Sequence, residues 1–355
     1  MSRTAPTNAA VKAVRVHAPH DLRVESVPVP ELAPHEVEVK IERGGICGSD
    51  LHYYHEGGFG TVRIKEPMVL GHEIAGTVVQ LGSAASHVKV GQRVAVNPSL
   101  ACGTCTFCQR GLQAHCLDMR FYGSAMRFPH IQGGFRERLV CHETQAVAVR
   151  DGLGAEVAAF AEPLAVCLHA IRRAGPLAGA KVLVTGSGPI GCLTILAARH
   201  AGAGMIVATD VADRTLDMAR RMGADVAINT LSHADGLEAY KADKGQFDVS
   251  FDCSGHPKAV ADVIACTRPR GRIVQVGIGG TEMPIAINAI VAKELELCGT
   301  FRFYEEFHWA VELLGSGRID VSPLHSATFG VDDAQKAFDL ASDKSKAMKV
   351  QLAFD

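Results

Sequence analysis

The first third of the chain alternates hydrophobic with polar residues, which predicts a series of short β-strands. The alternation has a period of two, as in strands that bury one face. The alternating stretches are residues 13–17, 24–29, 36–41, 74–79 and 93–96. Prolines at 28, 30 and 34 keep these strands short. Short strands joined by Gly- and Pro-rich turns, with little helix, indicate a small all-β barrel or sandwich.

From residue 181 onward the pattern changes to buried strands that alternate with helices. The predicted strands are residues 181–185, 205–209, 247–252, 272–277 and 295–299, and the predicted helices are 189–201, 214–222 and 260–266. This order predicts an α/β fold with a doubly wound parallel sheet. A further helix at 305–314 and short strands at 325–329 and 349–353 are expected to return to the β-rich domain.

A glycine-rich loop joins the first of these strands to its helix. Gly186, Gly188 and Gly191 form the pattern G-x-G-x-x-G, with Pro189 and Ile190 inside it. Between a strand and a helix, such a loop lets the backbone approach a pyrophosphate, whose charge the helix N-terminus stabilises. The alternative is a glycine turn that only permits close packing of strand and helix. We predict a dinucleotide site here.

The next predicted strand ends in an acid that favours NAD as the dinucleotide. Asp210 follows the second glycine by 22 residues and is placed to accept hydrogen bonds from the adenosine ribose. A carboxylate there repels a 2′-phosphate, although Arg214 lies nearby and keeps NADP possible. The nicotinamide end is expected near Gly277 and Phe301, after the later strands.

Residues 44–73 carry the side chains of a predicted catalytic metal site. Cys47, His72 and Glu73 offer a thiol, an imidazole and a carboxylate, which together suit zinc. Three protein ligands and one open position are typical of a catalytic zinc site. The alternative is a buried cysteine and a surface His–Glu pair that never meet. We expect these residues to lie in loops of the β-rich scaffold.

Glu162 places a carboxylate inside an apolar run. A buried unpaired carboxylate is costly, so we expect it to have a partner. A metal ion, or water bound to one, is a suitable partner.

Four closely spaced cysteines predict a second, structural zinc site. Cys102, Cys105, Cys108 and Cys116 can close tetrahedrally around one ion. An iron–sulfur cluster is an alternative, but its common cysteine run ends in a three-residue step and a proline that are absent here. A redox C-x-x-C pair would not explain all four thiols. A zinc ribbon that binds nucleic acid is disfavoured because the segment is not basic.

Two segments rich in aromatic residues and arginine are candidates for a substrate pocket. Residues 119–130 contain Arg120, Phe121 and Arg127, and a Gly-Gly-Phe sequence follows at 133–135. Arg302 lies between Phe301 and Phe303, just after the predicted sheet. The alternative is an ordinary surface loop and a surface arginine stacked on a neighbouring ring.

Composition changes this picture little but limits the class of protein. The chain has 355 residues, of which 47% are hydrophobic and 21% charged, and the length predicts two domains. A net charge of -2 gives no reason to expect nucleic-acid or membrane partners. No apolar run reaches the ~18–20 residues that span a bilayer. The polar first ten residues lack a signal core, so we expect a cytoplasmic protein. Eleven cysteines, an odd number, then indicate metal ligands and free thiols.

With a metal triad, a four-cysteine lobe and a dinucleotide loop in this order, the chain resembles the zinc-dependent medium-chain dehydrogenases over nearly its whole length. The resemblance implies a GroES-like, β-rich catalytic domain (residues 1–160 and 302–355) split by an inserted Rossmann domain (161–301). It also implies an active site between the two domains. A homodimer or homotetramer is expected, formed through the Rossmann sheet edge near residues 277–290.

Within this family the chain resembles the polyol dehydrogenase branch. Glu73 and Glu162 carry this likeness, because ordinary alcohol dehydrogenases have another cysteine as ligand. Residues 47–54 also match the branch. Residues 119–130, 133–135, 159–163 and 299–303 resemble a subfamily that interconverts L-idonate and 5-keto-D-gluconate. A sorbitol or xylitol dehydrogenase is the nearest alternative.

The resemblance also implies roles for individual residues. Zinc held by Cys47, His72 and Glu73, or by Glu162 in place of Glu73, would bind the C5 hydroxyl of the substrate. Two zinc ions per chain are expected, one catalytic and one structural. The remaining roles are a proton relay by Ser49 and His52, orientation of metal-bound water by Glu162 if it is not a ligand, a pocket lined by Tyr53 and Phe121, and a cation for the substrate carboxylate at Arg302, Arg120 or Arg127.

Two other classes of protein are alternatives. A non-catalytic protein that keeps this fold would be marked by the loss of a ligand, yet Cys47, His72, Glu73 and Glu162 are all present. A zinc-ribbon nucleic-acid binder would show salt-dependent binding to DNA or RNA.

Overall fold

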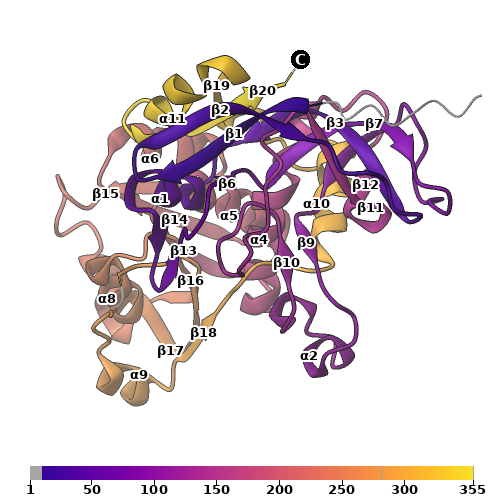
Figure 1. Ribbon diagram of the computed structural model, residues 1–355. Coiled ribbons are helices and arrows are strands. Elements are labelled where there is room, and N and C mark those ends of the chain that lie inside the picture. Colours follow the sequence, from indigo (N-terminus) through magenta and orange to yellow (C-terminus); the bar gives the residue numbers. More distant parts are fainter. Residues whose placement is uncertain (1–9, 281, 355) are drawn as a thin grey trace, which may run out of the picture.

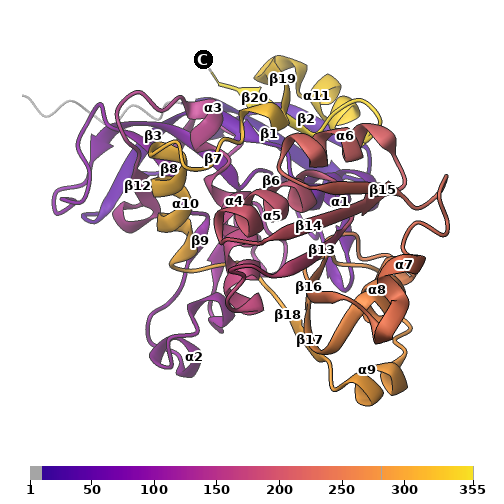
Figure 2. The ribbon, with the colours of Figure 1, turned by 180° about the vertical axis from the view of Figure 1, so that it is seen from behind.

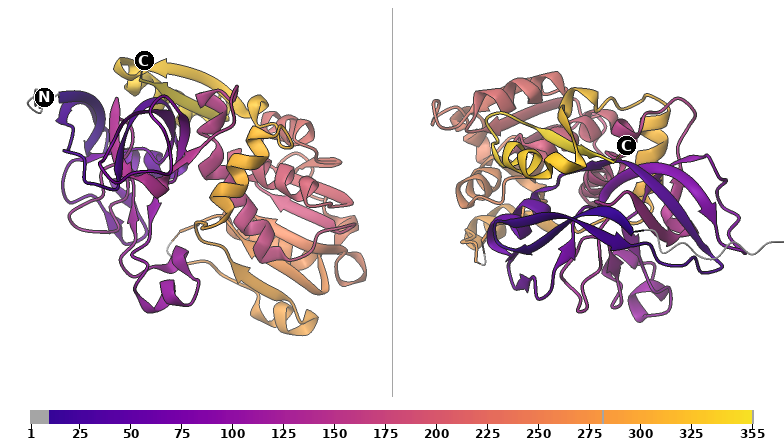
Figure 3. Two further views of the ribbon diagram at one scale, coloured as in Figure 1. Left: turned by 90° about the vertical axis from the view of Figure 1, so that its right-hand side faces the viewer. Right: turned by 45° about the horizontal axis from the view of Figure 1, so that its top comes forward.

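The computed structural model describes residues 10–280 and 282–354. Two sheet-based bodies lie side by side, a β-rich body and a parallel-sheet body (Figure 1). The left panel of Figure 3 separates them, with the yellow C-terminal segment crossing above both. Residues 1–9, on which the expectation of a polar N-terminus without a signal core largely rests, lie outside the described residues.

The β-rich body is built on a seven-stranded sheet and a three-stranded sheet. The larger sheet follows the order β12 (Ala146–Ala148), β8 (Arg93–Val96), β7 (Glu73–Leu81), β3 (Glu36–Gly45), β20 (Lys349–Ala353) and β19 (His325–Gly330), and β11 (Arg138–His142) also pairs with β3. The smaller sheet contains β2 (Asp21–Pro28), β1 (Ala10–Ala18) and β6 (Met68–Val69). Two short hairpins are β4 (Gly58–Phe59) with β5 (Val62–Arg63), and β9 (Ser99–Leu100) with β10 (Arg120–Phe121).

Four short helices complete this body. They are α1 (Gly48–Glu56), α2 (Thr106–Gln109), α3 (Ala155–Ala158) and α11 (Ala334–Ser342). Tyr54 of α1 meets Phe338 of α11 edge to face, with 5.5 Å between ring centroids. Both rings belong to the core that the buried strand residues line. The far side of α1 is therefore packed, which fixes the helix that carries several candidate site residues.

The second body is a six-stranded sheet in which every neighbouring pair is parallel. Its order is β15 (Val226–Asn229), β14 (Met205–Asp210), β13 (Lys181–Thr185), β16 (Phe247–Asp252), β17 (Thr267–Gln275) and β18 (Glu296–Gly299). In chain order this is 3-2-1-4-5-6, the arrangement of the Rossmann fold. The predicted α/β class with a doubly wound sheet is confirmed.

Helices cover both faces of the parallel sheet. They are α4 (Ala161–Ala174), α5 (Pro189–His200), α6 (Asp213–Arg221), α7 (Glu238–Lys241), α8 (Pro257–Cys266), α9 (Ile287–Lys293) and α10 (Glu306–Gly315). Alternate residues of β13 enter different cores, since Val182 and Val184 pack with α4 and α5 whereas Leu183 packs with α8. Figure 2 shows α4, α5 and α10 close together. The core around α4 and α10 also includes Ala75 and Ala95 of the β-rich body. The predicted domain limits at 160/161 and 301/302 remain a prediction.

Cys47 and His72 lie in loops as expected, whereas Glu73 is the first residue of β7. Other candidate site residues lie on helices. Ser49, His52 and Tyr53 lie on α1, and Glu162 lies in the first turn of α4. The α1 sequence has no clear apolar stripe, because its buried positions are Asp50, Tyr53 and Tyr54. Packing against the β-rich core, rather than amphipathic periodicity, stabilises this helix. Among the described residues, no helix is both long enough and apolar enough to cross a bilayer.

Candidate functional site

Three of the predicted metal ligands meet in one place. One ligand atom each from Cys47, His72 and Glu73 lies within 4.8 Å of the others. Cys47 is the residue before α1, His72 ends the connection from β6, and Glu73 begins β7. His72 and Glu73 are buried, and Cys47 is half-buried. A thiol, an imidazole and a carboxylate this close fit a zinc ion with one position left for another ligand.

Asp50 holds the cluster together, although sequence reasoning missed it. Its buried carboxylate accepts hydrogen bonds from the backbone N–H of Cys47 (3.0 Å) and of Gly71 (3.1 Å). It also lies 3.8 Å from Nδ1 of His72, a buried atom with no hydrogen-bond partner. A carboxylate beside a ligating histidine orients the imidazole ring in many metal sites. An acid three residues after the thiol, at the N3 position of α1, was the available signal.

Lys349 is a second residue that sequence reasoning missed. Its ammonium group contacts both carboxylate oxygens of Glu73, at 2.7 and 2.8 Å, and donates to the carbonyl of Ile46 at 3.2 Å. Lys349 and Glu73 are both buried. The pair fixes the carboxylate, since β20 supplies the lysine and β7 supplies the acid. Nothing local in the sequence pointed to it.

Two glycines make room for this arrangement. A Cβ on Gly45 would lie 2.2 Å from Oε2 of Glu73. Gly71 has φ +93°, and a Cβ there would lie 2.1 Å from the ring of Phe135. Larger residues at either position would displace the strand that carries the ligands.

Glu162 lies near the cluster but outside the group of three. Its side chain is buried and, among the described residues, forms no hydrogen bond or ion pair. Burial raises the pKa of this carboxyl group to about 8, and the charge of Glu73 adds to the effect, whereas His72 opposes it. The absence of a hydrogen-bond or ion-pair partner among the described residues fits a metal ion, or its water, as the partner of Glu162.

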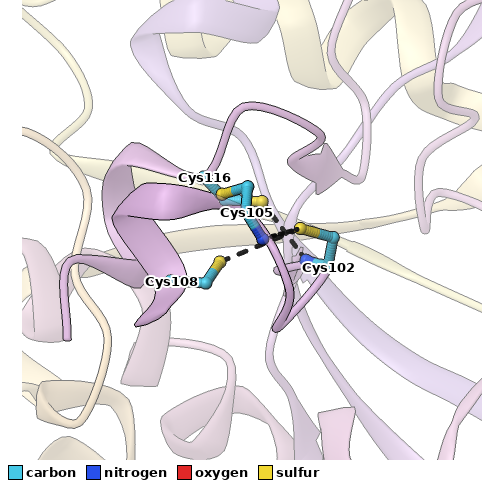
Figure 4. Close-up of side chains that lie close together, drawn as sticks. All are labelled: Cys102, Cys105, Cys108 and Cys116. Carbon is cyan, nitrogen blue, oxygen red and sulfur yellow. Dashed lines mark hydrogen bonds between the residues drawn. The ribbon is translucent and has the colours of Figure 1, made fainter. Parts of the chain in front are cut away.

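The four cysteines of the predicted structural site converge on one point (Figure 4). The sulfur atoms of Cys102, Cys105, Cys108 and Cys116 all lie within 4.8 Å of one another. Backbone N–H groups of Cys102 and Asp118 donate to the sulfur of Cys116, at 3.2 and 3.3 Å. Hydrogen bonds from Thr104 lower the pKa of the Cys102 thiol to about 6. Four thiols so arranged leave no open position, as expected for a structural metal site.

The glycine loop has the shape that a dinucleotide needs. Gly186 has φ +82°, and a Cβ on Gly191 would lie 1.8 Å from the carbonyl oxygen of Gly186. These two glycines serve the turn and the strand–helix packing. A Cβ on Gly188, at the start of α5, would meet no protein atom within 4 Å. Gly188 thus leaves open space where a pyrophosphate would approach the N-terminus of the helix.

Asp210 ends β14 beside this loop. Its carboxylate accepts hydrogen bonds from the backbone N–H of Ser187 (2.7 Å), Val211 (2.7 Å) and Ala212 (3.1 Å). The acid is thereby fixed, with lone pairs left for a ribose. Arg214 is exposed in the first turn of α6, next to Asp210 in the chain but without a contact to it. Gly277 and Phe301 follow β17 and β18, at the same edge of the sheet.

The remaining candidates separate into an inner and an outer group. The hydroxyl of Tyr53 is buried and accepts a hydrogen bond from the N–H of Ala125 (2.9 Å), so it holds the 123–126 loop. The ring of Phe121 lies 5.5 Å from that of His72. Arg302 lies over Phe121 at 4.6 Å.

The outer group is exposed or partly exposed. Arg127 is paired with Asp118 at 2.7 Å, and Arg120 faces solvent. His52 is half exposed, with Nδ1 3.1 Å from Glu56. Ser49 lies one turn earlier on α1.

Comparisons with known proteins agree with this geometry. Residues 33–151 match the family described as alcohol dehydrogenase GroES-like domain, and residues 189–316 match that described as zinc-binding dehydrogenase. An L-idonate 5-dehydrogenase (NAD(P)(+)) of Escherichia coli K12 is 48% identical over 316 residues, 89% of this chain and 91% of the relative. The crystal structure of L-idonate 5-dehydrogenase from that species superimposes with a TM-score of 0.94 at 43% identity, over 97% of this chain and 98% of that one. A sorbitol dehydrogenase of Bacillus subtilis is 34% identical, with 99% of each chain covered.

Substitution of Gly188 by alanine tests the dinucleotide loop. Because the added methyl group meets no protein atom, we expect Gly188→Ala to change the free energy of unfolding by less than about 0.5 kcal/mol. The same methyl group would enter the space of the pyrophosphate and weaken NADH binding by about tenfold or more. Fluorescence titration with NADH and urea denaturation measure the two effects. Gly191→Ala is the matched control, which we expect to cost about 1–3 kcal/mol of stability. Unchanged NADH binding by Gly188→Ala would contradict this assignment.

Proposed function

The chain belongs to the zinc-binding dehydrogenases with a GroES-like domain, and from this membership we propose that it interconverts L-idonate and 5-keto-D-gluconate. The reaction is a hydride transfer between C5 of the sugar acid and NAD(P). The resemblance inferred from the sequence is confirmed at the level of the family and of this oxidoreductase activity. The observation that carries the substrate class is the cation of Arg302, which lies over Phe121 beside the metal cluster. It forms no ion pair among the described residues, and the buried Glu162 is its acidic neighbour.

Cys47, His72 and Glu73 are proposed to hold the catalytic zinc, with Asp50 and Lys349 orienting two of these ligands. When bound, zinc lowers the pKa of a hydroxyl that it contacts, and the nicotinamide takes up the hydride. Cys102, Cys105, Cys108 and Cys116 are proposed to hold a second, structural ion. The donor sets support two zinc ions per chain.

Ser49 and His52 are proposed to carry the released proton from the substrate hydroxyl towards solvent. Both lie on α1, one turn apart, and His52 is half exposed beside Glu56. Its imidazole can accept a proton at one nitrogen and pass it to water. Glu162, buried without a protein partner, is proposed to complete the metal shell or to orient its water.

Arg302 is proposed to bind the carboxylate that distinguishes idonate from a polyol. Its guanidinium group is largely enclosed, whereas Arg127 is already paired with Asp118 and Arg120 faces solvent. A guanidinium matches a carboxylate with two parallel N–H donors. Tyr53 is proposed to position Arg302 indirectly, because its hydroxyl holds the loop that contacts Arg302.

NAD is the proposed preferred cofactor, although the relative from Escherichia coli carries NAD(P) in its name. The fixed carboxylate of Asp210 supports this preference, because it would repel a 2′-phosphate. A cytoplasmic location is also proposed. All eleven cysteines are free thiols, which supports a reducing compartment.

Two copies of the chain are proposed to pair through the edge of the parallel sheet. Among the described strands β18 is the edge of that sheet, and apolar side chains are exposed there at Leu297 (38%) and, on α9, at Val291 (71%). The ammonium nitrogen of Lys293 lies 2.7–2.9 Å from four backbone carbonyl oxygens, which fixes α9 beside this edge. An exposed apolar edge strand favours pairing with another chain.

A sorbitol or xylitol dehydrogenase remains the second candidate, because the sorbitol dehydrogenase of Bacillus subtilis matches 99% of the chain, although at a lower identity of 34%. Initial rates of NADH formation by the zinc-replete enzyme separate the two. We expect L-idonate to be oxidised with a kcat/KM at least about tenfold above that for sorbitol and xylitol at matched concentrations, since only the acid can pair with Arg302. The same series with NADP tests the cofactor preference. Faster turnover of the polyols would reject the sugar-acid assignment and leave the fold and metal site in place.

Metal analysis of Lys349→Met tests the proposed ligand set. Without the lysine, Glu73 loses the group that orients it, and we expect the affinity for the catalytic ion to fall about 10–100-fold. After dialysis against a chelator, the zinc content is then expected to fall from about two ions per chain to about one. Lys346→Met is the control, because Lys346 forms only an exposed pair with Asp343. Wild-type zinc retention by Lys349→Met would refute the supporting role of the lysine.

Sedimentation analysis tests the pairing of two copies. We expect a dimer or larger assembly for the wild type and a shift to monomers for Val291→Glu combined with Leu297→Glu, since buried charges without partners are costly. Leu231→Glu serves as control, because Leu231 is 75% exposed beyond β15 at the other end of the sheet. A monomeric wild type, or variants that still dimerise, would exclude this interface.

A further inference from the structure

The guanidinium group of Arg302 contacts two aromatic rings. It lies 4.6 Å from the ring centroid of Phe121 and 4.8 Å from that of Phe301. Both distances are within the range of a cation–π interaction. Phe121 comes from β10, beside the four-cysteine lobe, whereas Phe301 follows β18 of the parallel sheet. Each body of the molecule therefore contributes one ring.

Each of the two rings also meets a histidine ring. The ring of His72, a predicted metal ligand, lies 5.5 Å from that of Phe121 between centroids, at an interplanar angle of 51°. His115 of the four-cysteine lobe stacks on Phe301, at 6.2 Å and an interplanar angle of 25°. Phe121 also packs against the small core formed by the cysteines and Met119. These contacts hold the two rings that Arg302 meets.

Arg302 has the charge and the exposed donors to bind an anion. Burial lowers the pKa of its guanidinium group to about 10, so the group remains protonated at neutral pH. Among the described residues its polar contact is to the sulfur of Met126, at 3.1 Å, a weak acceptor. Neither the rings nor this sulfur satisfies its N–H donors in full, so donors are left for a ligand.

We propose that Phe121 and Phe301 are positioning residues that clamp Arg302 and thereby determine the selectivity for a sugar acid over a neutral polyol. This inference rests on the proposed function and assigns its selectivity to two further residues. A mobile arginine would lose side-chain freedom on binding a carboxylate, whereas a clamped guanidinium has already lost it. A guanidinium held in this way can pair with a carboxylate through two parallel N–H donors.

The clamp makes two predictions for Phe121→Leu and Phe301→Leu. Each is expected to lower the ratio of kcat/KM for L-idonate to that for sorbitol by about tenfold, measured at saturating cofactor. The dissociation constant of L-idonate from the enzyme–NADH complex, measured by NADH fluorescence, is expected to rise by a similar factor. Phe121→Tyr and Phe301→Tyr keep an aromatic face and are expected to retain the wild-type ratio and dissociation constant.

Trp309→Leu is the matched control. Trp309 lies under the guanidinium of Arg172, 5.6 Å from its ring centroid, in the same kind of contact on α10. Trp309 belongs neither to the metal cluster nor to the ring contacts around Arg302. We expect Trp309→Leu to leave both the ratio and the dissociation constant unchanged.

Double variants that combine Arg302→Ala with a leucine substitution distinguish failure of the clamp from failure of the proposed function. Because the rings act through the guanidinium, adding Phe121→Leu to Arg302→Ala is expected to cause no further loss for L-idonate. If Arg302→Ala leaves the ratio and the dissociation constant unchanged, Arg302 does not bind the carboxylate and that part of the proposed function fails. If Arg302→Ala lowers both but neither leucine variant does, the clamp alone is overturned. Equal losses for acid and polyol in the leucine variants would also overturn it.

Discussion

The buried ion pair between Lys349 and Glu73 is the contact on which the arrangement of the site depends. Two charges removed from water need each other, and removal of one partner leaves a costly unpaired charge. Because β3 pairs with both β7 and β20, Gly45 lies opposite Glu73 on one side and Gln351 on the other. Only a glycine at 45 leaves space for the carboxylate. Three strands from distant parts of the chain thus bring together the carboxylate of Glu73, the ammonium group of Lys349 and the space left by Gly45.

The functional groups come from both bodies of the molecule. Cys47 and Asp50 belong to α1 and its N-cap, Glu162 to α4, and Arg302 to the segment that leaves the parallel sheet. The chain crosses between bodies at α4 and again after β18, and both crossings carry a predicted site residue. This placement explains why the parallel-sheet body is inserted within the β-rich one. A site built at crossing points is held by the backbone of both bodies, which suits a reaction between a cofactor on one and a substrate on the other.

Much of the fold could be predicted because its signals are local. The strand–glycine–helix pattern at Gly186 and the four-cysteine spacing each lie within 15 or so residues, and both have a direct physical meaning. Lys349 could not be found in this way, since its partner is 276 residues away. Helix α1 was missed because tertiary packing, rather than an apolar stripe, stabilises it. Phe121 was identified only as a pocket residue, because its contact with Arg302 exists only in three dimensions. The roles assigned to single site residues remain predictions.

The distance along the chain between Glu73 and Lys349 also affects how the protein is made. At about 5–20 residues per second, a ribosome adds the lysine roughly 15–55 s after the acid. Throughout that interval the thiol, imidazole and carboxylate are already synthesised, but the cation that fixes the carboxylate is not. The metal site is therefore a late product of biosynthesis, completed after most of the parallel sheet has had time to fold.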